Sequence, residues 1–182
     1  INSGSQRLKN NNINTYRLDS EILLANIFNK KREEILTNLN KKVSIKIIRD
    51  FNKLIARRSL KEPIAHILNK KEFWSKDFFV DKNTLIPRPE TELMVEKIVS
   101  IFQKKEIQIL DIGTGTGCIL LSILSELKNS KGVGVDISKK AIQIAIKNSI
   151  KHELANKTKF LRKCFTKIYE QKFDLIVSNP PY

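Results

Sequence analysis

One stretch limits the possible folds more than any other: apolar residues at 107–112, a glycine-rich segment at 113–117, and a second apolar run at 119–127. The first run is short and ends at a glycine cluster, which predicts a buried strand. The second run is long enough for a helix. A glycine loop between them lets the backbone turn sharply and approach a ligand, which the first helical amides can bind. We therefore predict a nucleotide-type cofactor site.

The rest of this half of the chain continues the alternation of strands and helices. Strands are predicted at residues 132–135, 159–161 and 173–178, and a helix at 141–150 follows the first of them. Strands that alternate with helices are typical of an α/β fold with a parallel sheet. The fold class predicted from the pattern is therefore α/β.

Two carboxylates follow predicted strands in this region. Asp111 lies at the end of the first strand, where it can bind a cationic amine. Asp136 ends the second strand, 23 residues beyond Gly113, where a carboxylate can accept hydrogen bonds from ribose hydroxyls. Nicotinamide enzymes use a similar device, but Cys118 occupies the third glycine position of their fingerprint. The pattern therefore predicts a nucleoside cofactor without the complete dinucleotide motif.

The last predicted strand runs directly into Asn179, Pro180, Pro181 and Tyr182. Successive prolines lack amide hydrogens and have a fixed φ, so nearby carbonyls stay free to accept hydrogen bonds. The Asn179 side-chain carbonyl adds another acceptor, and Tyr182 can cover the face of a planar group. Converging acceptors suit an amide or amino nitrogen. The alternative is an ordinary surface turn or a polyproline-like ligand.

The N-terminal half has a different character. Residues 1–14 are rich in asparagine and are expected to be poorly ordered. Apolar residues at helical spacing then predict helices near 18–28, 35–39 and 43–55. These helices predict a small domain at residues 1–70, which serves either as a structural cap or to dock a macromolecular substrate.

Between the two halves we expect a linker at residues 71–89, followed by the cofactor domain at 90–182. Residues 72–74 and 78–80 predict the two strands of a hairpin around a turn at 75–77.

A stiff, charged segment follows the hairpin, because residues 84–92 include Pro87 and Pro89. Glu90 and Glu92 suit the start of the helix that follows, where carboxylates interact favourably with the helix dipole. That interpretation leaves Arg88 unexplained.

The formal net charge of +15 leans toward the N-terminal half. It favours an anionic partner such as RNA, although a general bias toward lysine explains it equally well. Cys118, Cys164, His66 and His152 do not have the spacing of a metal site, so packing is their default role. Isolated thiols, with no signal-peptide pattern and no long apolar run, predict a cytoplasmic protein.

The glycine loop combined with Asn-Pro-Pro-Tyr resembles the S-adenosylmethionine-dependent methyltransferases that modify planar nitrogens. Within that group the chain resembles the HemK/PrmC family of release factor glutamine methyltransferases, from about residue 15 to the end. The matching stretches are 62–67, 72–73, 85–92, 110–117 and 178–182. The segment at 85–92 is the most family-specific. DNA amino-methyltransferases share the glycine loop and the Asn-Pro-Pro-Tyr motif, but they are not expected to carry this segment.

The resemblance implies a Rossmann-like methyltransferase domain, preceded by a helical domain and a hairpin linker, and no metal. It implies transfer of a methyl group to the glutamine amide in the Gly-Gly-Gln loop of class I peptide chain release factors, which would modulate translation termination. It implies a monomer with no membrane partner and no nucleic-acid substrate. The implied cofactor residues are Asp111, Gly113, Thr114, Gly115, Thr116, Gly117, Asp136 and Cys164. The implied catalytic residues are Asn179, Pro180 and Tyr182, and Pro181 and Arg88 join them in binding substrate.

Two features depart from the family pattern. Where the family carries an acidic or amide residue and then an aromatic one, this chain has Lys163 and Cys164. Lysine cannot accept a hydrogen bond from an adenine amino group, which predicts weaker cofactor binding or a compensating residue. The sheet stops after its fourth strand, about a hundred residues short of ordinary doubly wound domains. We therefore expect these 182 residues alone to be inactive and poorly stable.

Two other functions are compatible with the motifs. A DNA or RNA adenine amino-methyltransferase would place a flipped base in the same Asn-Pro-Pro-Tyr pocket, and the basic charge favours it. A binding module attached to a degenerate cofactor fold is the non-enzymatic alternative, and Lys163 favours it. Cofactor binding separates this last reading from the two enzymes.

Overall fold

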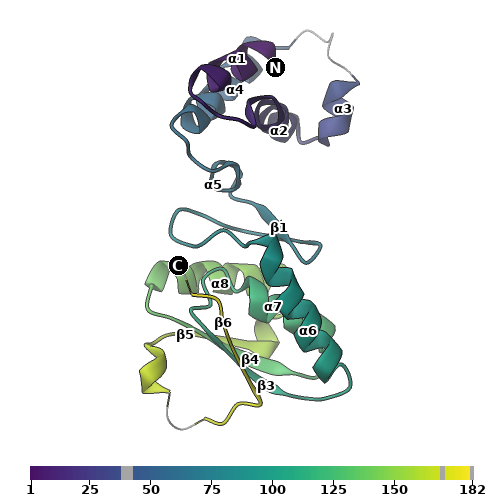
Figure 1. The fold of residues 1–182 in the computed structure, drawn as a ribbon, viewed down its shortest axis with the longest axis vertical. Coiled ribbons are helices and arrows are strands. Elements are labelled where there is room, and N and C mark those ends of the chain that lie inside the picture. The colour runs from purple at the N-terminus through teal and green to yellow at the C-terminus, as the bar shows by residue number, and fades with distance from the viewer. Residues whose placement is uncertain (38–42, 169–170, 181–182) are drawn as a thin grey trace. The chain divides into compact units, whose positions relative to one another are not determined.

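Two compact units, residues 1–69 and 70–182, make up the chain (Figure 1). The computed structural model describes residues 1–37, 43–168 and 171–180. No helix among these residues has the length and apolar character needed to cross a membrane. The described part of the first unit forms the helices α1 (Asn2–Asn10), α2 (Tyr16–Phe28), α3 (Arg32–Leu36), α4 (Ile45–Ser59) and α5 (Ile64–Leu68).

Helices α2, α3 and α4 confirm the three helices predicted from apolar periodicity, although Leu39 lies outside the described residues. The apolar faces of α2 and α4 meet in a core that includes Leu23, Phe51 and Ile55. The Ser44 hydroxyl accepts the backbone N–H of Ile47 and caps the start of α4.

The expectation that residues 1–14 are poorly ordered is wrong, because α1 packs into this core. Leu8 is fully buried in the same cluster as Leu23. Gly4 allows the close approach of α1, since a Cβ atom at this position would lie 2.6 Å from the Phe51 ring. One leucine and one glycine therefore order a segment whose composition is typical of disorder.

The second unit begins with a hairpin and continues as an α/β domain. Its elements are β1 (Lys71–Phe73), β2 (Lys76–Phe78), the 3-10 turn η1 (Pro89–Thr91), α6 (Glu92–Phe102), β3 (Gln108–Ile112), α7 (Cys118–Glu126), β4 (Lys131–Asp136), α8 (Lys139–Lys151), η2 (Ala155–Lys157), β5 (Thr158–Arg162), η3 (Phe165–Lys167) and β6 (Leu175–Ser178).

The predicted hairpin is confirmed, but its turn is not at residues 75–77. The turn consists of Trp74 and Ser75, both with positive φ, and β1 pairs antiparallel with β2 on either side. Such a turn is usually built from asparagine and glycine, so Trp-Ser gives no sequence signal. The hairpin strands place Phe73 and Phe78 in the core of the α/β domain.

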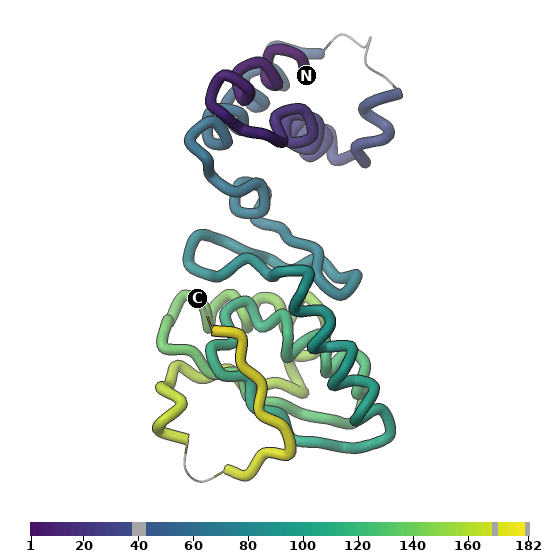
Figure 2. The backbone as a smooth tube through the Cα atoms, viewed as in Figure 1, coloured from purple at the N-terminus to yellow at the C-terminus, as the bar shows by residue number. Residues whose placement is uncertain are grey.

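The main sheet is parallel, with strand order β5-β4-β3-β6, which confirms the predicted α/β fold. From β3 the chain runs outward through β4 and β5 and then returns to add β6, drawn in yellow, beside β3 (Figure 2). Ile112 pairs with Val135 on one side and with Ser178 on the other. The carboxyl ends of β3, β4 and β6 therefore meet where the strand order reverses, which is where open α/β sheets bind ligands.

The sheet carries its main hydrophobic core on one face. There Ile109 and Val177 belong to the same buried cluster as Val95 of α6 and Leu121 of α7. Helix α6 thus packs into the same core as the two strands whose carboxyl ends meet, which holds its N-terminus in a fixed position relative to them. The opposite face carries a smaller cluster.

Candidate active site

The predicted glycine loop joins β3 to α7 at the carboxyl edge of the sheet. Gly113, Gly115 and Gly117 all have positive φ, a conformation that side chains with a Cβ atom rarely adopt. At Gly113 a Cβ atom would have no other atom within 4 Å, so the space next to the backbone is open. Gly117 caps the start of α7. The loop thus combines open space with a helix N-terminus, as the sequence predicts.

Asp111 is 1% exposed and lies in β3, just before this loop. Its Oδ2 accepts a hydrogen bond of 2.7 Å from the Thr114 hydroxyl, whereas its buried Oδ1 has no partner in the described part of the chain. Burial raises the pKa of the Asp111 carboxyl to about 6, the Thr114 hydrogen bond opposes the increase, and the Asp136 carboxylate adds to it. A buried carboxylate with an unused oxygen fits a cationic ligand.

Asp136 ends β4 and faces the same loop. One carboxylate oxygen accepts the Gly115 N–H at 3.1 Å, and the other accepts the Ser138 N–H at 2.8 Å. Each oxygen retains a second lone pair, so the side chain can still accept hydrogen bonds from two hydroxyl groups. The two contacts fix the orientation of Asp136, as a ligand-binding carboxylate requires.

Thr114 and Thr116 are buried and shape the loop from inside. The Thr114 carbonyl accepts the Gly117 N–H at 2.7 Å, and the Thr116 hydroxyl accepts the Cys118 N–H at 3.3 Å. Both threonines therefore stabilise the loop through hydrogen bonds within it.

Asn148, in α8, also holds the loop, and no step of the sequence reasoning identified it. Its side-chain Nδ2 donates to the carbonyls of Thr116 and Phe79, and its Oδ1 accepts the Phe79 N–H. This fully buried amide connects the glycine loop to the segment after the hairpin. The sequence did contain a signal for a buried role: Asn148 lies three residues after Ala145, on the apolar face of the predicted helix.

Lys163 and Cys164 follow β5 at the same edge of the sheet. The Lys163 N–H donates to the Asp136 carbonyl at 3.1 Å. The Thr166 hydroxyl donates to the Cys164 sulfur at 3.2 Å and lowers the pKa of that half-buried thiol. Burial instead raises the pKa of Cys118 to about 12, in keeping with its default packing role. The edge beside Asp136 thus carries a thiol where the resemblance predicts an aromatic ring.

A pocket of about 400 Å³ lies at the carboxyl end of β6, the strand that pairs with β3. It brings together the proline-rich segment and the end of β6, which are far apart in the sequence. The Asn179 Nδ2 donates to the Thr91 hydroxyl at 3.2 Å. The residues that line the pocket are Arg88, Glu90, Thr91, Met94, Ser178 and Asn179.

Two of the other predicted substrate residues lie in this pocket or next to it. Arg88 lines the pocket, and Pro180 is exposed directly after Asn179. Pro181 and Tyr182 lie outside the described residues. The geometry therefore joins Arg88 to the Asn179 turn, a proximity that sequence spacing could not reveal. It also adds Thr91, to which the sequence analysis gave no role.

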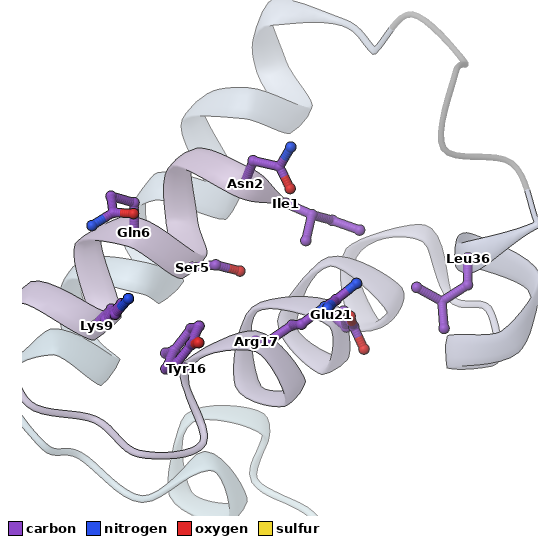
Figure 3. Close-up of a pocket in the computed structure, with 9 residues that line it drawn as sticks. All are labelled: Ile1, Asn2, Ser5, Gln6, Lys9, Tyr16, Arg17, Glu21 and Leu36. Carbon is purple, nitrogen blue, oxygen red and sulfur yellow. Dashed lines mark ion pairs between the residues drawn. The ribbon is translucent and has the colours of Figure 1, made fainter.

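The helical unit contains a second pocket, of about 410 Å³, between α1, α2 and the end of α3 (Figure 3). Most of its charged groups already have partners, because Glu21 pairs with Arg17 and Arg32 and the Lys9 ammonium lies over the Tyr16 ring. The pocket was not predicted from the sequence, and it contains none of the predicted site residues.

Comparison with protein families gives two matches to the chain. Residues 1–68 match the PrmC N-terminal domain, and residues 103–181 match a methyltransferase domain. The first match covers the helical unit, and the second covers the sheet, the glycine loop and Asn179. Both types of domain predicted from the resemblance are therefore present.

Two proteins with similar sequences are named as methyltransferases. The chain is 45% identical over 166 residues to the release factor glutamine methyltransferase of Buchnera aphidicola subsp. Schizaphis graminum, covering 91% of this chain and 60% of that protein. It is 40% identical over 202 residues to the bifunctional methyltransferase of Rickettsia typhi, covering 100% of this chain and 39% of that protein. The chain thus spans 60% and 39% of the length of these two relatives.

Among solved structures, the SAM-dependent methyltransferase from Agrobacterium tumefaciens matches 62% of this chain and 39% of its own, with a TM-score of 0.53 and 19% sequence identity. A likeness at this level of identity concerns the fold. The α/β unit accordingly has the fold of S-adenosylmethionine-dependent methyltransferases.

Proposed function

Since the chain belongs to the family of methyltransferases that carry a PrmC N-terminal domain, we propose that the intact protein methylates the Gly-Gly-Gln glutamine of class I release factors. The observation that carries the proposal is the pocket where Asn179 meets Arg88 and Thr91. In this pocket the family-specific proline-rich segment lies beside a turn suited to a planar nitrogen. The consequence would be a change in translation termination.

S-adenosylmethionine, the cofactor of this methyltransferase family, supplies an electrophilic methyl group when it is bound. The residues present fit this cofactor: the unpartnered Asp111 oxygen suits its cationic part, and the oriented Asp136 carboxylate suits its ribose hydroxyls. The open space at Gly113 lets it approach the backbone. Cys164 would lie toward the adenine, as the family resemblance implies.

Asn179 and the Pro180 carbonyl would act on the substrate amide. An amide nitrogen is a poor nucleophile because its lone pair is delocalised into the carbonyl, so it must be held in a reactive orientation. Acceptors placed on both N–H groups hold it there, and they stabilise positive charge that develops on the nitrogen. This arrangement requires no strongly basic residue before transfer, and we assign none.

Cofactor affinity should depend on pH through Asp111. Its folded-state pKa of about 6 is above the ordinary value, so the folded protein binds more protons than the unfolded chain between about pH 4 and pH 6. The Asp111 contribution to stability therefore falls as pH rises through 6, while its ability to bind a cation increases. Titration with S-adenosylhomocysteine should give about tenfold tighter binding at pH 7 than at pH 5.

Asp111→Asn should bind this ligand more weakly and remove most of the pH dependence, because the amide does not ionise. Asp174→Asn is the matched control, since Asp174 is an exposed residue that accepts a backbone N–H at the opposite end of β3. An unchanged pH profile in Asp111→Asn would assign the titration to another group.

Transfer of labelled methyl from S-adenosylmethionine tests the proposed substrate. The intact protein is offered a class I release factor, the same factor with its Gly-Gly-Gln glutamine changed to alanine, and duplex DNA. The proposal predicts label on the unmodified factor alone. Label on DNA alone would favour the adenine amino-methyltransferase, and cofactor binding without transfer to any substrate would contradict both substrate assignments.

A further inference from the structure

The start of α6 and the end of β6 meet through one side-chain contact. The Asn179 Nδ2 donates to the Thr91 Oγ1 at 3.2 Å, inside the pocket of about 400 Å³. The Asn179 Oδ1 accepts no hydrogen bond from the residues that the structure describes. The asparagine therefore donates to Thr91 through its NH2 group, and its side-chain oxygen stays available as an acceptor.

Both ends of this contact are held by other interactions. The Thr91 N–H donates to the Arg88 carbonyl at 3.0 Å, and the adjacent Glu92 accepts the Trp74 N–H at 2.8 Å. On the other side, Ser178 pairs with Ile112 in the sheet, and its hydroxyl donates to the Ile112 carbonyl. Thr91 and Asn179 thus approach each other from fixed parts of the fold.

We propose that Thr91 is a positioning residue that holds the Asn179 amide where it can face the substrate nitrogen. The inference rests on the proposed function, in which Asn179 must accept a hydrogen bond from a planar NH2 group. An asparagine amide has similar shape after a flip of its oxygen and nitrogen, but the flipped form would present a donor to a donor. Because the Thr91 hydroxyl can accept from Nδ2 or donate to Oδ1, it fixes the position of the amide, and the substrate NH2 group selects the form that presents Oδ1.

Thr91→Val retains the shape of the side chain but removes the hydroxyl. We expect kcat for methyl transfer to fall about tenfold, the factor that corresponds to the loss of one hydrogen bond that holds a side chain in place. S-adenosylhomocysteine affinity should stay unchanged, and Thr91→Ser should retain kcat within about twofold because it restores the acceptor. Ser100→Ala is the matched control, since the Ser100 hydroxyl bonds within α6, to the Lys97 carbonyl.

A double-mutant cycle separates positioning from a general loss of structure. In an Asn179→Ala background the amide is absent, so Thr91→Val should cause no further loss of kcat. Losses that multiply in the double variant would overturn the proposal. A wild-type kcat in Thr91→Val would also overturn it, while leaving glutamine methylation in place.

An activity-independent measurement covers the case in which release factors are not the substrate. Exchange of the Asn179 side-chain amide protons with water, followed by NMR, should be slower in the wild type than in Thr91→Val. Equal exchange in the two proteins would overturn the proposal whatever the substrate is. If the proposed function is wrong, a release factor incubated with the wild-type protein and labelled S-adenosylmethionine would carry no label.

Discussion

Replacing Asn179 with alanine is expected to lower kcat for methyl transfer by about 10²–10³-fold, the usual cost of removing one acceptor or donor aligned with developing charge. The side chain lies in the pocket with Arg88 and Thr91, where it would hold the substrate nitrogen. Among the described residues, the side chain forms no hydrogen bond with the glycine loop, Asp111 or Asp136. The affinity for S-adenosylhomocysteine should therefore stay close to that of the wild type.

Steady-state transfer to a release factor, together with calorimetric titration of S-adenosylhomocysteine, would check both parts of this prediction. Asn129→Ala is the matched control, because Asn129 is an exposed asparagine in the turn between α7 and β4. If Asn179→Ala lost cofactor affinity in the same proportion as kcat, the turn would be part of the cofactor site. A wild-type kcat would show that Asn179 takes no part in methyl transfer.

The cofactor half of the site was readable from the sequence because its signals are local. A strand, a glycine loop and a helix occupy consecutive residues, and each has its own periodicity or composition. Asp111 and Asp136 follow from the same pattern, since carboxyl ends of parallel strands meet at one edge. Their positions at the ends of β3 and β4 required no knowledge of distant contacts.

The substrate half could not be completed in this way. Thr91 and Asn179 are 88 residues apart in the sequence. Their contact depends on how α6 packs against β3 and β6. The sequence singled out the Asn179 turn and the segment at 84–92 separately, each with an ordinary alternative. Only the fold shows that the two segments share one pocket.

Small residues and buried polar groups account for the other differences. Composition at residues 1–14 suggests disorder, but the close packing of Gly4 and Leu8 outweighs it. Asn148 has a buried role that depends on backbone groups from two other segments. Periodicity reports which face of a helix is apolar, but it does not identify the partner of a polar residue on that face.

Arg58→Ala is expected to destabilise the helical unit by about 3–5 kcal/mol, because it leaves a buried carboxylate without its charged partner. The Arg58 Nε donates to Asp19 Oδ2 at 2.6 Å, with only 16% and 7% of the two side chains exposed. The Thr15 hydroxyl donates to the same oxygen and cannot replace a positive charge. This pair connects α2 to α4, so its loss should loosen both helices.

Hydrogen exchange in the intact protein can localise the effect, because protection in α2 and α4 should fall while protection in β3 and β4 stays near the wild-type level. Arg49→Ala is the matched control: Arg49 is 66% exposed and its ion pair with Asp50 spans 3.9 Å, so a change below about 1 kcal/mol is expected. Asp19→Asn combined with Arg58→Met should recover much of the lost protection, since it removes the buried charge together with its partner. If the double variant were as unstable as Arg58→Ala, the loss would come from Arg58 packing or from its bond to the Glu62 carbonyl, and the uncompensated charge would not be its cause.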